Sequence, residues 1–197
     1  MANDSKVFAF EPELSNYQKI LENITLNHLN NIKLFNLAVG SETKQTQIFV
    51  NQDNDGGHAL WDVGKHPFNQ KSLNNQTMQN TQLSTLDNIL SQAGNITNLK
   101  MIKVDTEGAE LDVIKGAVNT ISKYDVPYII CEINRFGLQQ MRTNETELRE
   151  FMNSLEYATY LVTSNSSNQL VKLPVGKYYQ TSHVFNVLFT RQNFRPQ

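Results

Sequence analysis

The stretch LKMIKVDTEGAELDVIKGA, residues 99–117, constrains the fold of this chain more than any other part of it. Its short apolar run at the beginning is typical of a strand buried on both faces. Asp105 comes at the carboxyl end of that strand, where open α/β sheets bind their ligands. Apolar residues then recur at helical spacing and predict a helix that covers the sheet. These residues are Leu111, Ile114, Ala117, Val118 and Ile121.

Four acidic residues near this predicted turn have different interpretations. Glu110 lies at the helix start, where the macrodipole favours negative charge, so we interpret it as a capping residue. Asp105 and Glu107 are interpreted as functional, because two carboxylates at a strand tip lose hydration energy unless something uses them. Glu132, followed by Asn134, ends a later predicted strand at the same edge of the sheet. Asp105, Glu107 and Glu132 are therefore predicted to converge, either to orient and deprotonate a hydroxyl or to hold a hard divalent cation.

The same stretch resembles the signature of the FkbM-type methyltransferases, which transfer a methyl group from S-adenosylmethionine to a hydroxyl. The segments VFAFEPELSNYQKILENITLN, LFNLAVG, STLDNIL and IICEIN follow in the order that this family uses, over roughly residues 6–162. The resemblance implies an α/β fold with a doubly wound, Rossmann-like methyltransferase sheet, N-terminally truncated and with an antiparallel last strand. It implies a single methyltransferase-like domain over residues 1–197.

The resemblance also implies roles for individual residues. It places Asp105 and Glu107 near the transferred methyl group and Glu132 near the acceptor. The acceptor is expected to be a sugar or another polyhydroxylated small molecule, because the predicted loops are polar and no basic surface is evident. The sequence does not choose between a carboxylate base and a divalent cation for this reaction.

Cofactor-binding residues are expected after two earlier predicted strands. Glu11 follows the strand KVFAF and occupies the position that accepts hydrogen bonds from ribose hydroxyls in the resembled family, or else is a simple charge at a helix N-terminus. Asn36 and Ala38, in the predicted strand 32–39, lie where related enzymes line the adenine pocket, although a buried strand end explains both residues equally well. His58, in a predicted loop, is a candidate general base or a solvated histidine.

One part of the family pattern is absent from the sequence. Methyltransferases of this class begin with a strand and a glycine-rich turn that cradles the amino-acid portion of the cofactor, but only MANDS precedes KVFAF and the chain has no G-x-G pair. The missing strand belongs between KVFAF and MIKVD, so these two strands are expected to have unpaired edges. Three explanations are open: a fragment of a longer methyltransferase, which we prefer, direct pairing of the two strands, or a second chain that supplies the strand.

Composition excludes several classes of protein. The net charge of −2 and the lack of a Lys/Arg cluster argue against a nucleic-acid partner. The single cysteine, Cys131, lies in an apolar run and is interpreted as a buried hydrophobic residue rather than a disulfide, metal or catalytic thiol. No apolar run approaches the roughly 20 residues of a membrane span, and the N-terminus lacks a signal-peptide core. We therefore expect a cytoplasmic protein without a membrane partner.

Further local expectations concern the connections. Residues 64–82, rich in Asn and Gln, are predicted to form a long loop or lid, and residues 164–169 a polar turn. Pro12 is expected at the first position of the helix after KVFAF. Arg135 is a candidate to neutralise one of the three converging carboxylates.

Two other functions remain as alternatives. A catalytically inactive methyltransferase-like domain could serve as a binding or assembly module, and the absence of the glycine loop favours this. A nicotinamide-dependent oxidoreductase also has an acidic residue after a strand, but it needs the same absent G-x-G-x-x-G loop.

Overall fold

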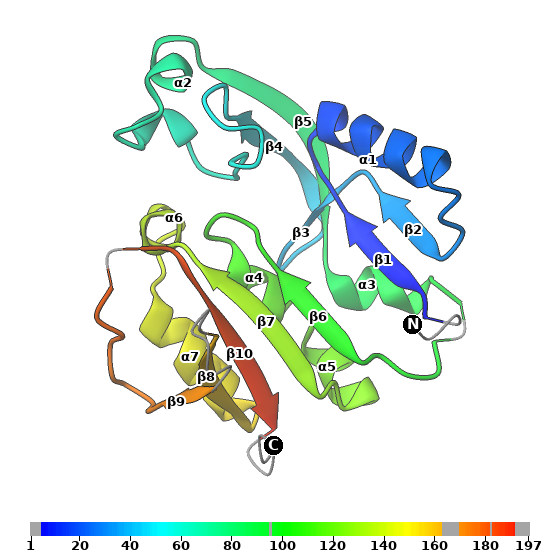
Figure 1. Ribbon diagram of the computed structural model, residues 1–197, viewed down its shortest axis with the longest axis vertical. Helices are drawn as coiled ribbons and strands as arrows, with labels where there is room; N and C mark the ends of the chain where they lie inside the picture. The colour runs from blue at the N-terminus through cyan, green and yellow to red at the C-terminus, as the bar shows by residue number, and fades with distance from the viewer. Residues whose placement is uncertain (1–4, 95, 163–169, 182, 192–197) are drawn as a thin grey trace. The chain divides into compact units, whose positions relative to one another are not determined.

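The structure is a computed structural model that describes residues 5–94, 96–162, 170–181 and 183–191. The chain divides into two compact units, Met1–Thr85 and Leu86–Gln197. The first unit holds strands β1 to β5 and the second holds strands β6 to β10 (Figure 1). The predicted polar turn at 164–169 lies outside the described residues.

The first unit begins with a β–α–β segment. Strands β1 (Val7–Phe10) and β2 (Ile32–Phe35) pair in parallel, and helix α1 (Leu14–Leu26) connects them. The helix begins after Glu13, whose carboxylate accepts the N–H of Asn16 at 2.7 Å. Pro12 therefore precedes the cap, and its expected place at the first helical position is wrong, because Glu13 supplies the side-chain oxygen that caps the helix.

The second part of this unit is a three-stranded sheet in the order β3-β5-β4. Its strands are β3 (Ala38–Val39), β4 (Lys44–Val50) and β5 (Thr77–Ser84). The predicted strand 32–39 is thus two strands in two sheets. The Asn36 side chain donates to the carbonyl oxygens of Glu11 and Pro12, at 2.9 and 3.2 Å, at the end of the β1–β2 ladder.

The expectation of a long loop over residues 64–82 is wrong. This segment contains a short 3-10 helix η1 (Val63–Lys65), helix α2 (Gln70–Asn74) and most of β5. The carboxylate of Asp53 accepts the backbone N–H groups of Lys71 and Ser72 at 3.0 and 2.9 Å, and so satisfies the start of α2 from a distant loop. A contact of this kind leaves no periodic pattern in the sequence.

The second unit is built on a five-stranded sheet in the order β6-β7-β10-β8-β9. Strands β6 and β7 are parallel, whereas β10 is antiparallel to both β7 and β8, so the predicted antiparallel last strand is confirmed. The strands are β6 (Met101–Val104), β7 (Tyr128–Ile133), β8 (Tyr157–Val162), β9 (Val171–Leu173) and β10 (Phe185–Arg191).

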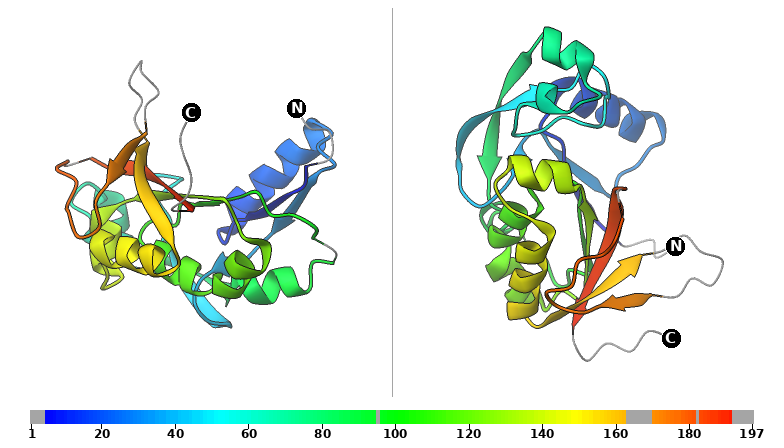
Figure 2. Two further views of the ribbon diagram at one scale, coloured as in Figure 1. Left: turned by 90° about the horizontal axis from the view of Figure 1, so that it is seen from below. Right: turned by 90° about the vertical axis from the view of Figure 1, so that its left-hand side faces the viewer.

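Helices α4, α5 and α7 lie on one face of this sheet (Figure 2). Between them and the strands lies a core that includes Ile114, Ile129, Ile133 and Phe189, each 0% exposed. Cys131 is buried there as predicted, and burial raises the pKa of its thiol well above the ordinary value. The helices of this unit are α3 (Leu86–Ser91), α4 (Glu110–Lys115), α5 (Val118–Tyr124), α6 (Arg135–Gln140) and α7 (Glu145–Ser154).

Strands β1 and β6 each have a single strand neighbour among the described residues. Strand β1 pairs with β2, and β6 pairs with β7. Each therefore has one edge that takes part in no ladder, as edge strands do. Within the same residues, no helix is both long and apolar enough to cross a bilayer.

Candidate active site in the turn after β6

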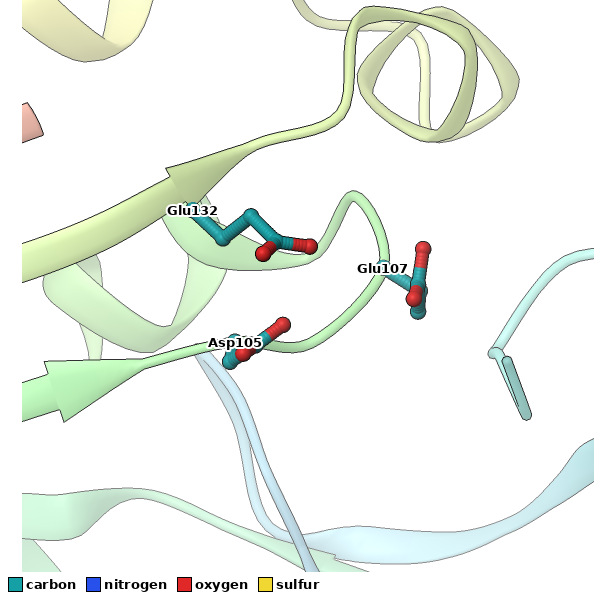
Figure 3. Close-up of side chains that lie close together, drawn as sticks. All are labelled: Asp105, Glu107 and Glu132. Carbon is teal, nitrogen blue, oxygen red and sulfur yellow. The ribbon is translucent and has the colours of Figure 1, made fainter. Parts of the chain in front are cut away.

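Three carboxylates come together at the carboxyl ends of β6 and β7. Asp105 directly follows β6, Glu107 lies in the next turn, and Glu132 belongs to β7 (Figure 3). Because Val104 pairs with Cys131, the residues that follow them, Asp105 and Glu132, lie at the same level of the sheet. One oxygen of each carboxylate lies within 4.8 Å of the others. The structure thus brings together the three residues that the sequence predicted to converge.

The turn that carries Glu107 has an unusual backbone. Glu107 has φ 54° and Gly108 has φ 112°, both in the left-handed region that side chains disfavour. Glu110 stabilises this conformation, since its Oε1 accepts the N–H groups of Thr106 and Gly108 and the hydroxyl of Thr106, each at 3.1 Å. Glu110 is only 1% exposed. It therefore holds the turn directly, which the sequence interpretation as a helix-capping charge had not included.

Burial and mutual repulsion set the charge state of the site. Burial raises the pKa of Glu107, and the negative charges of Asp105 and Glu110 add to this, whereas a hydrogen bond from Asn134 opposes it. The pKa of Glu132 is raised by burial and by the charges of Asp105 and Glu107. Asp105 is more exposed, and its Oδ2 lies 2.7 Å from Nζ of Lys103. Glu107 and Glu132 are therefore stronger bases than ordinary carboxylates.

The arrangement fits two kinds of chemistry. A carboxylate with a raised pKa can accept the proton of a hydroxyl that becomes a nucleophile. Mg²⁺ and Ca²⁺ bind carboxylate oxygens at about 2.0–2.6 Å, so oxygens on opposite sides of one ion lie about 4–5 Å apart. The separation of at most 4.8 Å therefore also fits a single divalent cation held by all three residues. Both alternatives from the sequence remain.

Arg135 does not neutralise this cluster, so that expectation is wrong. Its Nε and Nη2 donate to Oε2 of Glu145 at 2.9 and 2.6 Å, because Arg135 begins α6 and points towards α7. Glu145, 0% exposed, also accepts a hydrogen bond from Nη1 of Arg149 at 2.9 Å. Sequence reasoning missed this buried network, for which the only signal was the i,i+4 spacing of Glu145 and Arg149.

The predicted cofactor residues belong to the first unit. Glu11 follows β1, and its Oε1 accepts the N–H of Glu13 at 2.8 Å; burial raises its pKa. Asn36 lies beside it through the hydrogen bond to the Glu11 carbonyl oxygen. Ala38 is 6% exposed, in a different sheet, where it pairs with Leu83. The structure thus brings Glu11 and Asn36 together, and the cofactor roles of all three residues stay predictions.

His58 is a structural residue of the first unit. Its Nδ1 accepts the backbone N–H of Asn51 at 2.9 Å, and its side chain is 9% exposed. The neutral ring has one lone pair, and this hydrogen bond uses it. The interpretation as a solvated histidine is therefore wrong, and the ring holds the 51–58 loop instead of offering a base.

Comparison with known proteins identifies the family of this fold. A family model described as the methyltransferase FkbM domain matches residues 1–160. The chain belongs to the FkbM methyltransferase family. A curated relative, "Methyltransferase 1" of Beauveria bassiana (strain ARSEF 2860), is 23% identical over 122 residues, which cover 57% of this chain and 49% of that protein.

A solved FkbM structure shows the same fold. The crystal structure of methyltransferase FkbM from Methylobacillus flagellatus KT matches with a TM-score of 0.51 at 15% identity, over 94% of this chain and 36% of that one. This FkbM-family chain therefore has the Rossmann-like methyltransferase fold. It spans about half the length of the curated relative and about a third of the solved chain.

Proposed function

We propose that this chain is an S-adenosylmethionine-dependent O-methyltransferase that acts on a hydroxyl group of a sugar or another small molecule. The observation that supports it most is the set of three carboxylates within 4.8 Å at the ends of β6 and β7. Two of them, Glu107 and Glu132, have a raised pKa and so can take the proton of an acceptor hydroxyl. Family membership supplies the reaction type.

Each group has a defined task in this proposal. S-adenosylmethionine, when bound, supplies an electrophilic methyl group on sulfur. The acceptor oxygen takes the methyl group as the bond to sulfur breaks, and its proton passes to a carboxylate of this chain. Glu132 orients the acceptor, while Asp105 and Glu107 lie near the transferred methyl group. The protein thus contributes alignment and a base.

The residues present fit one end of the cofactor. Oε2 of Glu11 has no hydrogen-bond partner in the part of the chain that the structure describes, so it can accept a ribose hydroxyl. Asn36 ties the ends of β1 and β2 together and so fixes the position of Glu11. For the amino-acid end, the chain has no G-x-G pair. We therefore propose ribose binding by Glu11 and weak overall cofactor affinity.

The test is methyl transfer by the purified chain. It is incubated with S-adenosylmethionine and a panel of polyhydroxylated acceptors, and S-adenosylhomocysteine and the methylated product are quantified by mass spectrometry. Asp105→Asn should lower turnover on the order of 100-fold, because it removes one of the three carboxylates that carry the proposed chemistry. Asp112→Asn, the same substitution on α4, serves as the matched control and should retain turnover. Absence of product with every acceptor would overturn the proposal.

The same assay separates a base from a cation. Each reaction is run with Mg²⁺ and with EDTA. Activity that EDTA abolishes and Mg²⁺ restores assigns Asp105, Glu107 and Glu132 as ligands, whereas activity that persists in EDTA assigns them to proton transfer.

The alternative is an inactive binding or assembly module, which the missing G-x-G pair favours. In it, a second chain adds a strand to the edge of β6 that takes part in no ladder among the described residues. Such a module keeps its partner in the Asp105→Asn variant, whereas an enzyme loses turnover. Analytical ultracentrifugation of the wild-type chain and of the Asp105→Asn variant, alongside the methyl-transfer assay, distinguishes a binding module from an enzyme.

A further inference from the structure

Asn134, between β7 and α6, has both ends of its side-chain amide engaged. Its Oδ1 accepts the N–H of Gly137 at 3.1 Å and so caps α6. Its Nδ2 donates to Oε2 of Glu107 at 2.6 Å. Because the cap needs an acceptor, the carbonyl end of the amide must face the helix, and the N–H₂ end must face Glu107. The helix cap therefore fixes the orientation of the amide, with its N–H₂ group towards Glu107.

The backbone of the acidic turn also lies directly on α6. A Cβ added at Gly137 would lie 2.4 Å from the carbonyl oxygen of Glu107. A Cβ added at Gly108 would lie 2.2 Å from the carbonyl carbon of Gly137. Atoms do not approach so closely, so both positions must lack a side chain. The turn and the first residues of α6 form one packed assembly, in which Asn134 and Glu107 have little freedom to separate.

We propose that Asn134 is a positioning residue, which fixes the Glu107 carboxylate by connecting the acidic turn to the start of α6. In this role it acts through its hydrogen bond to Glu107. The connection joins the turn after β6 to the turn after β7, so it also sets the spacing between Glu107 and Glu132. The kinetic part of this inference rests on the proposed methyltransferase function, whereas the structural part does not.

Two substitutions separate this role from helix capping. Asn134→Ser keeps a good capping oxygen but is too short to reach Glu107. Asn134→Asp keeps an equally good cap but faces Glu107 with a second carboxylate oxygen in place of a donor. Capping alone predicts that Asp is tolerated at least as well as Ser. Positioning predicts the reverse order, with Asp the more damaging because like charges meet.

The first measurement is amide hydrogen exchange at Thr106 and Gly108, the donors to Glu110 in the turn. Loss of a charge-assisted hydrogen bond should speed their exchange on the order of tenfold in Asn134→Ser, and more in Asn134→Asp. The second is kinetic. The kcat for methyl transfer should fall on the order of tenfold or more, with the KM for S-adenosylmethionine unchanged, because misplacement of a reacting group affects the chemical step.

Asn144 provides the matched control. It caps α7 in the same way, with Oδ1 accepting the N–H of Glu147 at 3.0 Å. Asn144→Ser and Asn144→Asp should leave turn exchange and kcat unchanged. The inference is overturned if the amides of the acidic turn exchange in Asn134→Asp as they do in wild type. It is also overturned if these amides exchange in Asn134→Ser as they do in Asn144→Ser. If the wild-type chain transfers no methyl group, the proposed function fails, and the exchange measurement still decides the role of Asn134.

Discussion

Two strand–turn–helix segments of this chain resemble each other in sequence but differ in burial. Strand β1 is followed by Glu11 and Glu13 and then α1, and β6 is followed by Asp105 and Glu107 and then α4. No residue of α1 is buried. Helix α4, although shorter, buries Glu110, Leu111, Val113 and Ile114.

The size of the sheet around each segment explains this difference. Strand β6 belongs to a five-stranded sheet with helices on one face, whereas β1 belongs to a two-stranded sheet. On β1, Phe8 and Phe10 stack with Phe35 of β2 at ring distances of 6.3 and 5.2 Å, but none of the three is fully buried. A two-stranded sheet is marginal by itself. Similar local patterns thus occur in both units, while the number of packed neighbours decides how rigidly each segment is held.

The largest expected difference between the two segments is in core packing. Leu111→Ala, at a residue 5% exposed, should lower the free energy of unfolding by about 2–5 kcal/mol. Leu21→Ala in α1, at a residue 46% exposed, should lower it by less than about 1 kcal/mol. Urea denaturation followed by circular dichroism measures both. Equal losses would contradict the contrast in burial.

The second-largest expected difference is in the stability that an acidic residue contributes at each turn. Glu110→Ala leaves the N–H of Gly108, a buried donor, without its acceptor, and should cost about 2–3 kcal/mol. Glu13→Ala removes a helix N-cap and should cost about 1 kcal/mol. The comparison uses the same denaturation assay. A larger loss at Glu13 would show that the first segment is the more tightly held.

Acid should weaken the His58 loop of the first unit. Burial lowers the pKa of His58 despite the nearby charges of Glu13 and Asp55, and Lys19 lowers it further. A lowered pKa favours the neutral ring in the folded state, so this stability is present above about pH 6.5 and is lost as the pH falls through the folded value. Amide exchange at Asn51, corrected for intrinsic rates, should accelerate as the pH falls below about 6.5 in wild type but not in His58→Gln.

The acidic turn of the second unit should respond in the opposite direction. Burial is the main cause of the raised pKa of Glu107, Glu110 and Glu132. A raised carboxyl pKa gives stability that is fully present below about pH 4.5 and is lost as the pH rises through the folded value. Exchange at Gly108, corrected for intrinsic rates, should therefore slow as the pH falls from about 7.5 towards 4.5. The same direction of change at Asn51 and Gly108 would contradict the contrast.

The smallest expected effects come from the exposed ion pairs. Lys103→Gln removes the pair with Asp105 at 2.7 Å, and Lys19→Gln removes the pair with Asp55 at 3.6 Å. Exposed pairs contribute about 0–1 kcal/mol, so both variants should unfold close to wild type, whichever segment they belong to. Thermal melts measure the change. A loss well above that range at Lys103 would show that the pair also supports the acidic turn.

The sequence by itself determined the α/β class, most of the strands and the edge of the sheet where the acidic residues gather. These features follow from local patterns: an apolar run predicts β6 and β7, and strands that run in parallel end at the same edge. The convergence of Asp105, Glu107 and Glu132 could be predicted for that reason. The family could be recognised because its linked motifs lie in order along the chain.

Only the tertiary structure decided what each polar side chain contacts. Arg135 pairs with Glu145, and Asp53 caps α2 from a distant loop; no spacing in the sequence predicts either contact. Where residues 32–39 divide between two sheets, Asn36 likewise donates hydrogen bonds to residues 24 and 25 positions earlier. The contacts of Arg135, Asp53 and Asn36 were not predicted for the same physical reason. Hydrophobic periodicity reports only whether a residue faces the core, whereas a hydrogen bond depends on which distant backbone group the fold places within reach.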